Sequence, residues 1–437
     1  MSVYILLHYE AREADIFIIV RLLIFTYAPA GLGHLRVTGA LVAGRPKKHP
    51  YELLGTSDPL VTKVHRITSI NPLAKKIGEA FQYGLLEDLF TNVYVWYLRH
   101  NTREVYKKML RIIEEQPEAE GVTVVATHFG LAHQIAAIKN KIKRRTGKQV
   151  DMVVQVTDDT SQHIWCVRGA DITFVPSKQT KEELEWYAKQ AGVKINIEVS
   201  PYPTSPSFSK KLDSKIESRE DALAKESDLP VNVIVPISGA AVGLGYLSRF
   251  ILSLDKASSK FHFWIVAKRS AQTKTFLSTI GKLRWVQLIT GRSDNETVGL
   301  YEKVYRENLI HMEITKPSEQ AFKSLIHPSM VGGSVLLFTE PVGRQERDNI
   351  AFLKRHKILG TKEDQASMSD EKHYPRAVML PKNPEEAARC ILSCFDKGDF
   401  EKMVKDFSYS PESMMTSEIS ERGTWLFWEE LRLLGLI

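Results

Sequence analysis

The chain has 437 residues, of which 43% are hydrophobic and 25% are charged, and its net charge at pH 7 is +7. Single cores stop growing at about 250 to 300 residues, so this length predicts two domains. The composition excludes disordered and fibrous classes. The basic excess suits contact with phosphate-bearing molecules or anionic lipid, although a charge of this size is also an ordinary aid to solubility.

The cysteines and the apolar stretches indicate where the protein works. Cys166, Cys390 and Cys394 have no metal-binding or disulfide spacing, so we expect free thiols in a reducing cytoplasm. The apolar stretch 16–30 is interrupted by Arg21 and lacks a cleavage pattern, which favours a buried strand over a signal peptide or a spanning helix. Nothing else approaches the roughly 20 apolar residues that cross a bilayer, so we expect any membrane contact to be peripheral, on the cytoplasmic face.

Short apolar runs alternate with longer helical patterns along the chain, which predicts parallel sheets covered by helices. In the first part we expect strands at 16–27, 122–126, 152–156 and 172–175, and helices at 35–42, 73–115, 132–145 and 181–190. A polar stretch at 204–230 marks the junction between domains. After it we expect strands at 231–237, 261–267, 285–289 and 335–338, and a helical tail at 384–437 with an apolar face that can dock. The sequence therefore predicts an α/β fold with two Rossmann-like domains, 1–205 and 206–414.

Two of the expected strands lead into glycine-rich loops that open a helix, at 30–34 and 238–245. Glycines there let a ligand approach exposed backbone amides, and the helix dipole favours negative charge. Either loop by itself is also compatible with an ordinary turn. His34 sharpens the first one, because an imidazole at that place can take a proton from a hydroxyl group.

The order of motifs along the chain resembles that of the monogalactosyldiacylglycerol synthase and MurG-like group, glycosyltransferase family 28. The matching segments of the first domain are Gly31-Leu32-Gly33-His34, Thr127-His128-Phe129, Val156-Thr157-Asp158, His163, Trp165 and Phe174-Val175-Pro176-Ser177. Those of the second are 238–245, 267–270, Gly291-Arg292-Ser293-Asp294-Asn295, Ile314-Thr315-Lys316-Pro317 and Arg344-Gln345-Glu346-Arg347-Asp348-Asn349, with Arg344 where the family has glycine. The resemblance spans about 27–349. It implies the glycosyltransferase B arrangement, in which two domains face a cleft and the C-terminal helices, here 415–437, return to the first domain.

The resemblance also implies roles for individual residues. His34 would be the general base, aided by Asp158, which follows a parallel strand. The other acceptor contacts would be Gly33, His128, His163 and Trp165. The donor contacts would be Gly239, Gly243, Gly245, Arg269, Thr315, Lys316, Glu319, Gln345, Glu346 and Asn349. No aspartate-based metal motif is evident, so we expect no metal, and no cofactor besides the nucleotide-sugar substrate.

One segment departs from the family pattern. After the lysine the family continues with glycines and later a glutamate that holds the ribose, whereas this chain reads Pro317-Ser318-Glu319-Gln320-Ala321-Phe322-Lys323-Ser324. Either Glu319 takes over the ribose in a rebuilt loop, or donor preference differs, or sugar-nucleotide binding is lost.

Two stretches suit a membrane surface, the aromatic region 81–99 and the basic run 139–148, although core packing and a solvated helix end are their ordinary alternatives. No nucleic-acid-binding module accompanies the charge. The sequence therefore predicts a metal-independent glycosyltransferase that moves a hexose or N-acetylhexosamine from a nucleotide sugar, a UDP-sugar, to a lipid, polyisoprenoid or other membrane-associated acceptor. The alternatives are a sugar-nucleotide epimerase of the same fold, a noncatalytic sugar-nucleotide-binding relative and a polyanion-binding protein.

Overall fold

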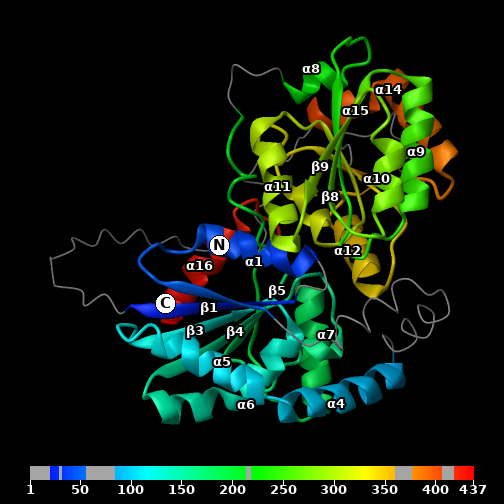
Figure 1. Cartoon of the computed structure of the whole chain (residues 1–437). Coiled ribbons are helices and arrows are strands. Elements are labelled where there is room, and N and C mark those ends of the chain that lie inside the picture. Colours follow the sequence, from blue (N-terminus) through cyan, green and yellow to red (C-terminus); the bar gives the residue numbers. More distant parts are fainter. Residues whose placement is uncertain (1–19, 29–31, 56–83, 213–217, 360–375, 406–417) are drawn as a thin grey trace, which may run out of the picture.

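The computed structural model describes residues 20–28, 32–55, 84–212, 218–359, 376–405 and 418–437. These residues form two lobes, each built on a parallel sheet of six described strands with helices on both faces (Figure 1). The strands are nearly continuous apolar runs because a parallel sheet covered on both faces is buried on both. The predicted fold class, α/β with two Rossmann-like domains, is confirmed.

The first sheet has the order β2-β1-β3-β4-β5-β6, with every neighbouring pair parallel. Its strands are β1 (Arg21–Tyr27), β2 (Tyr51–Gly55), β3 (Gly121–Ala126), β4 (Gln149–Gln155), β5 (Ile172–Val175) and β6 (Ile197–Val199). Its helices are α1 (Leu32–Gly44), α4 (Gly84–His100), α5 (Arg103–Glu114), α6 (Phe129–Thr146), the short η1 (His163–Trp165) and α7 (Lys178–Gln190). Arg21 is tolerated in the buried β1 because its guanidinium pairs with Asp151 of β4 and its Nε donates to Thr123 Oγ1 at 2.8 Å.

The second sheet has the order β12-β11-β10-β7-β8-β9, again with every neighbouring pair parallel. Its strands are β7 (Val231–Pro236), β8 (Phe261–Lys268), β9 (Val286–Gly291), β10 (Met312–Thr315), β11 (Val335–Phe338) and β12 (Ala377–Met379). Its helices are α8 (Arg219–Leu223), α9 (Leu244–Ala257), α10 (Lys274–Ile280), α11 (Asp294–Glu307), the short η2 (Glu319–Leu325), α12 (Arg344–Arg355), α14 (Pro384–Lys397) and α15 (Asp399–Lys405). Counted from β7, this is the 3-2-1-4-5-6 order of a dinucleotide-binding sheet.

The last helix, α16 (Gly423–Leu433), lies on the first sheet rather than on the second (Figure 1). Trp428 Nε1 donates to the Leu41 carbonyl at 3.0 Å, and Phe427 packs edge-on against Phe174 of β5 at 5.3 Å. Burying the apolar face of α16 in this way is what the aromatic residues of the tail predict. The C-terminal tail therefore crosses back to the first lobe.

One apolar cluster joins the lobes. It contains Phe25 and Phe174 of the first sheet together with Phe322 of η2 and Phe352 of α12, and all four side chains are fully buried. Tyr202, on the connection between the sheets, stacks on Phe322 with ring centroids 3.9 Å apart. The two lobes thus share buried surface besides the chain that links them.

Some predicted boundaries differ from those observed. The helical region expected at 73–115 is, in its described part, two helices separated at Asn101 and Thr102; residues 73–83 lie outside the described residues. The start of the strand expected at 16–27 also falls outside them, and β1 begins at Arg21. The chain leaves the first sheet at Val199 and enters the second at Val231, so the domain boundary at 205 falls inside the connection and stays a prediction.

Candidate functional site

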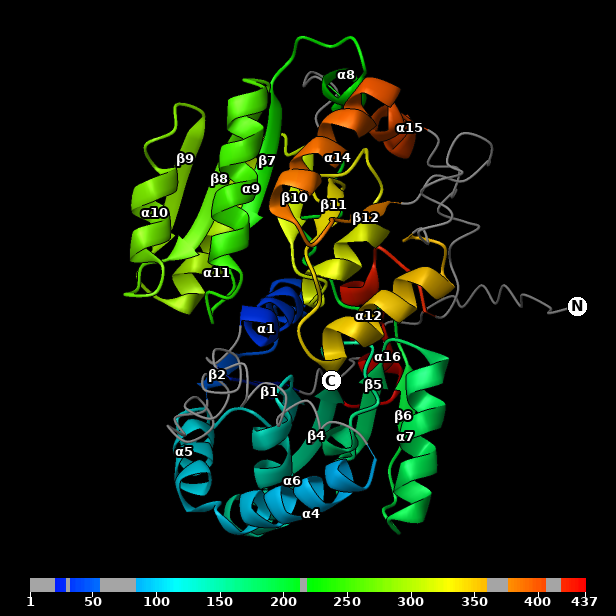
Figure 2. The ribbon, with the colours of Figure 1, turned by 90° about the vertical axis from the view of Figure 1, so that its right-hand side faces the viewer.

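The sheet orders indicate where a ligand can bind. In open parallel sheets, ligands lie outside the carboxyl ends of the strands, at the point where the strand order reverses. That point lies between β1 and β3 in the first sheet and between β7 and β10 in the second. Helix α1, which follows β1, lies between the two sheets and contacts both α11 and η2, so the two reversal points meet at the junction of the lobes (Figure 2).

His34 stands at the start of α1 with a defined ring orientation. Its Nδ1 lies 2.5 Å from the carbonyl oxygen of Thr127, which directly follows β3. A carbonyl only accepts, so Nδ1 carries the proton and the lone pair resides on Nε2. Thr127 Oγ1 in turn lies 2.8 Å from Thr38 Oγ1 and donates to the Thr26 carbonyl at 3.0 Å, which fixes the strand end against α1.

Two of the predicted acceptor residues lie beside this imidazole. The rings of His34 and His128 meet edge-on with centroids 5.4 Å apart, and Trp165 lies 6.5 Å from His34. His128 is also the N-cap of α6, because its Nδ1 accepts from the Leu131 amide at 3.4 Å. Trp165 is buried in the first core. Both residues therefore have a structural role in addition to any contact with a ligand.

His163 belongs to a different surface. Its ring stacks on Tyr187 at 3.7 Å, and its Nδ1 lies 2.6 Å from a carboxylate oxygen of Asp88. It borders a surface hollow of about 310 Å³, which is lined by Ser161, His163, Glu182, Glu183, Trp186 and Arg344. Of the predicted acceptor residues, His128 and Trp165 thus lie beside His34, whereas His163 borders this hollow.

Asp158, which follows β4, lies at the junction and contacts the second lobe. Its Oδ1 accepts from Asn349 Nδ2 of α12 at 2.8 Å, and its Oδ2 accepts from Thr157 Oγ1 at 3.4 Å. Withdrawal from water raises the pKa of this carboxyl to about 8, assisted by the nearby charges of Glu319 and Glu346, while the two hydrogen bonds oppose the shift. Asp158 is therefore mostly protonated at neutral pH, unlike an ordinary aspartate.

Several predicted donor residues on α12 are used to join the lobes. Asn349 is fully buried; it accepts from the Asp159 amide at 2.8 Å and donates to the Pro317 carbonyl at 3.1 Å. Gln345 Nε2 donates to Gln162 Oε1 of the first lobe at 2.8 Å. The predicted donor residues Gln345 and Asn349 thus make protein contacts here, and their role in donor binding stays a prediction.

Arg344, which replaces the family's glycine, makes the strongest of these contacts. Its NH1 lies 2.7 Å from Glu87 Oε2 of α4, and its NH2 donates to Ser161 Oγ at 2.9 Å. The Glu87 side chain is 6% exposed, so water screens this ion pair little. Sequence reasoning named Arg344 only as a departure from the motif and did not foresee a contact between lobes.

Lys316 and Glu346 face each other where β10 ends. Lys316 Nζ lies 4.0 Å from Glu346 Oε1, while Glu346 Oε2 accepts from the Val342 amide at the start of α12. Thr315, the last residue of β10, is buried, and its carbonyl accepts from the Thr339 amide at 2.9 Å. These residues lie at the reversal point of the second sheet, and their role as donor contacts stays a prediction.

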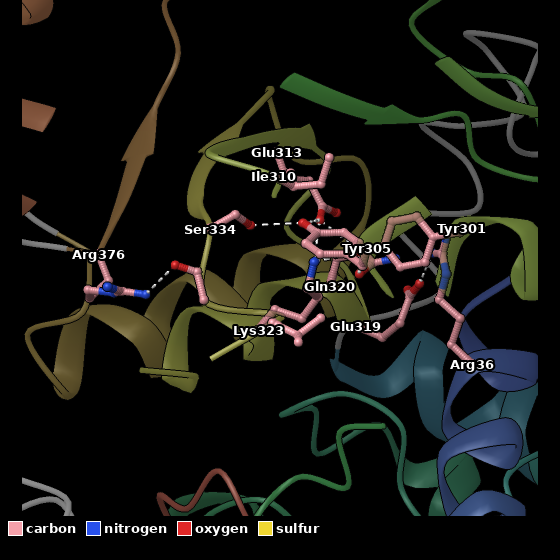
Figure 3. Close-up of polar contacts among 12 residues, drawn as sticks. Arg36, Tyr301, Tyr305, Ile310, Glu313, Glu319, Gln320, Lys323, Ser334 and Arg376 are labelled. Carbon is pink, nitrogen blue, oxygen red and sulfur yellow. Dashed lines mark hydrogen bonds and ion pairs between the residues drawn. The ribbon is translucent and has the colours of Figure 1, made fainter. Parts of the chain in front are cut away.

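The segment after Lys316 is rebuilt as the buried η2, and its first residue reaches the first lobe (Figure 3). Glu319 forms an ion pair with Arg36 of α1, and both side chains are mostly covered, 11% and 15% exposed. A Cβ added to Gly33 would lie only 2.7 Å from Glu319 Oε2, so the carboxylate touches the backbone of α1 at a place that only glycine leaves open. Glu319 therefore contacts the start of α1 in the first lobe.

The guanidinium of Arg36 has further partners from the second lobe. With its amide oxygen turned toward Arg36, Gln320 accepts from the three guanidinium nitrogens at 2.6 to 3.1 Å and donates to Tyr301 Oη at 2.9 Å. The guanidinium also lies 4.9 Å from the ring centre of Tyr301. The sequence offered one signal for Arg36 that the prediction did not use, because it is a lone charge among the buried apolar residues of α1.

Beside Arg36, the second lobe contains a buried polar cluster (Figure 3). Lys323 Nζ pairs with Glu313, whose side chain is fully buried, and the hydroxyls of Tyr301 and Tyr305 donate to the same carboxylate oxygen at 2.7 and 2.6 Å. Burial lowers the pKa of Lys323 to about 8, although the charge of Glu313 opposes this shift. Each charge is compensated inside the protein, so the cluster is built to hold η2 in place.

The glycine loop of the second lobe is more exposed. Gly239, Gly243 and Gly245 are exposed, and a Cβ added to Gly243 or Gly245 would meet open space. Ala241 adopts a positive φ of 53°, an uncommon conformation that marks a constrained loop before α9. Arg269 lies near the end of β8, where its Nε donates to Thr290 Oγ1 at 2.7 Å.

A small cavity lies at the junction beside Arg36 and Glu319. Its volume is about 30 Å³, and it is lined by Arg36, Val37, Tyr202, Pro203, Thr204, Ser205, Phe208, Tyr301, Glu302, Glu319, Gln320 and Lys323. That is the space of about one water molecule. The gap expected to hold a sugar nucleotide is thus filled at this point by Arg36 and Glu319, and a ligand there would have to move them.

The described part of the chain bears on two expectations, that no metal is bound and that no segment spans a membrane. It contains no group of three or more histidine, cysteine, aspartate or glutamate side chains arranged to hold a metal ion. It also contains no helix with the length and apolar character needed to cross a bilayer. The expectation of metal-independent chemistry stays a prediction.

No protein-family model and no curated protein matches the chain. Among solved structures, it is similar to the S. aureus MnaA-UDP co-structure, with 11% identity and a TM-score of 0.49 over 96% of this chain and 98% of that one. It is also similar to MurG of Acinetobacter baumannii (13% identity, TM-score 0.46, 94% and 99% covered). A third match is the UDP-GlcNAc 2-epimerase of Neisseria meningitidis bound to UDP-GlcNAc (10% identity, TM-score 0.45, 94% and 100% covered). Membership of the MurG-like group stays a prediction.

Proposed function

We propose that this chain binds a nucleotide sugar, a UDP-sugar, at the junction of its two lobes and transfers the sugar to an acceptor hydroxyl. The observation that carries this proposal is His34 at the reversal point of the first sheet, with its Nδ1 held by the Thr127 carbonyl. With Nδ1 as the donor, Nε2 is the nitrogen that would take a proton from an acceptor. The exposed loop before α9 and the end of β10 lie where parallel sheets bind phosphates.

In this mechanism the acceptor oxygen attacks the anomeric carbon while the bond to the nucleotide diphosphate breaks. His34 takes the hydroxyl proton. Backbone amides and basic side chains offset the charge that grows on the leaving diphosphate. Asp158, being mostly protonated at neutral pH, acts as a hydrogen-bond donor at the junction rather than as the carboxylate partner of His34 that the resemblance implies.

The test is a screen of UDP-glucose, UDP-galactose and UDP-N-acetylglucosamine for binding, hydrolysis and transfer. For the sugar that is turned over, His34→Gln should lower kcat by about 10²- to 10⁴-fold, the usual contribution of a general base, while the affinity for the donor changes little. His262→Gln, a half-buried histidine on β8, is the matched control and should leave kcat unchanged. Equal turnover in His34→Gln and the wild type would remove the histidine from the mechanism.

A sugar-nucleotide epimerase is the second candidate, favoured by the grouping of carboxyls at the junction. The charges of Glu319 and Glu346 both act on Asp158, so three carboxyl groups lie near one another at the junction. An epimerase needs an acid and a base but no acceptor groove. Incubating the donor in D2O separates the two reactions: deuterium in a recovered, epimerised sugar nucleotide supports the epimerase, whereas released UDP with a glycosylated acceptor supports transfer.

The acceptor is proposed to be a lipid or another membrane-associated molecule, because one face of α4 is apolar and exposed. Leu86, Leu89, Phe90, Val93 and Trp96 are each 47% to 63% exposed and recur at three- and four-residue spacing, which places them on one side of the helix. An exposed apolar face of this kind suits a membrane interface. The basic run supports this only in part, because Lys139 pairs with Asp171 and Lys148 donates to backbone carbonyls.

Flotation with vesicles that contain anionic lipid tests this contact. Leu89→Asp combined with Trp96→Asp should abolish flotation, because both side chains are exposed and apolar. The paired control, Trp186→Asp, changes an equally exposed tryptophan on α7 and should leave flotation unchanged. Flotation of the α4 variant at the wild-type level would contradict the proposed membrane contact.

A further inference from the structure

Glu319 occupies a position that suits an anion of a ligand. Its carboxylate touches α1 at Gly33, the second residue of that helix. The first amides of a helix have no partner inside the helix, and its dipole favours negative charge there. The carboxylate comes from the other lobe, so this contact forms only when the lobes are together.

Arg36 holds the Glu319 carboxylate and fits a phosphate equally well. Its NH1 pairs with Glu319 Oε1, Gln320 accepts from the guanidinium nitrogens, and the Tyr301 ring lies against one face of the guanidinium (Figure 3). A guanidinium presents planar paired donors that match carboxylate and phosphate oxygens alike. Exchange of one anion for the other therefore requires no change in the side chains that position Arg36.

We propose that Glu319 is a built-in competitor of the nucleotide diphosphate, and that Arg36 exchanges Glu319 for a phosphate when the donor binds. This inference rests on the proposed function and names two residues of its donor site. A diphosphate entering beside Gly33 meets the Glu319 carboxylate, and like charges placed side by side repel. Binding thus displaces Glu319, which keeps the junction closed and the Gly33 position filled when no donor is present.

The experiment measures the affinity of the full chain for UDP and for inorganic pyrophosphate by titration calorimetry. Pyrophosphate tests the anion contact without a contribution from the base. Glu319→Gln keeps the size of the side chain and an oxygen for Arg36 but removes the competing charge. It should bind both ligands more tightly than the wild type, on the order of tenfold, because a like-charge contact is removed. Adding Arg36→Ala to this variant should abolish the gain.

Glu302→Gln is the matched control, because Glu302 lines the same cavity but does not touch Gly33. The affinities of Glu302→Gln for UDP and pyrophosphate should stay within about twofold of the wild type. Should Glu319→Gln fail to fold, Glu319→Asp serves instead, since it withdraws the carboxylate by one methylene and should also tighten binding.

The outcomes separate the inference from the proposed function. If the wild type binds UDP and the Glu319 variants bind it equally or more weakly, the competitor role is overturned and the proposed function stands. If the wild type and the variants bind neither UDP nor pyrophosphate, both are overturned. The exchange is supported if UDP and pyrophosphate bind only to Glu319→Gln. It is also supported if they bind to Glu319→Gln more tightly than to the wild type and to Glu302→Gln.

Discussion

The ends of the two sheets meet at one junction, yet they are built differently. At the end of β3, the backbone carbonyl of Thr127 holds Nδ1 of His34. At the end of β10, the charged side chains Glu319 and Lys323 pair with Arg36 and Glu313. The first arrangement orients an imidazole through the backbone, whereas the second uses ion pairs to stabilise the structure.

This difference shows that similar sheets do not guarantee similar sites, since function resides in the loops. Both departures from the family pattern, the segment after Lys316 and Arg344 in place of glycine, produce contacts between the lobes. Residues expected to hold a donor thus also hold the lobes together. Three experiments test this contrast and follow in order of decreasing effect, with the pH experiment counted per pH unit.

The largest effect is expected in the buried cluster of the second lobe. Lys323→Ala leaves the carboxylate of Glu313 buried without its cation and should lower the free energy of unfolding by about 3–5 kcal/mol. Denaturant unfolding measures the change. Lys303→Ala is the control, because its pair with Glu307 is exposed, and it should change stability by less than about 1 kcal/mol. Equal losses in the two variants would mean that the cluster does not hold the lobe.

An intermediate effect is expected where α12 meets the first lobe. Arg344→Ala removes charged hydrogen bonds to Glu87 and Ser161 and should weaken the contact by about 1.5–3 kcal/mol. Hydrogen exchange of the backbone amides at 159–162 should accelerate, while exchange in β4 stays unchanged. Arg432→Ala, at an exposed pair on α16, should alter neither. Unchanged exchange at 159–162 would show that Arg344 does not join the lobes.

The smallest effect, counted per pH unit, is a pH dependence at Asp158 in the first lobe. Its pKa rises from an ordinary value of 3.8 to about 8 in the folded protein, so the folded state keeps a proton that the unfolded state releases between these values. The group therefore favours folding fully below pH 4, and this contribution is lost as pH rises toward 8, by at most about 1.4 kcal/mol per unit. Asp158→Asn mimics the protonated form and should gain stability relative to the wild type as pH rises from 5 to 8. The melting temperatures of both proteins measure this from pH 5 to 8. The same change with pH in Asp158→Asn and in the wild type would contradict the pKa shift.

The contrast between the two sites was only partly predictable from the sequence. Gly33, His34, His128 and Trp165 could be grouped because their order and their positions after strands bring them to one sheet end. The partners of Gln345 and Asn349 could not, since they are Gln162 and Asp158, more than 180 residues away. Glu319 was recognised as out of register, but its contact with Gly33 depends on how the lobes pack.

By itself, the sequence determined the two parallel sheets and the places where their loops begin, because apolar runs, glycines and helix signals act over a few residues. It also determined that the tail carries an apolar face that must be buried. Only the tertiary structure decided that this face lies on the first lobe, that Arg36 meets Glu319 and that Asp158 keeps its proton. These features depend on which charges become neighbours when water is removed between lobes, and no local pattern records that.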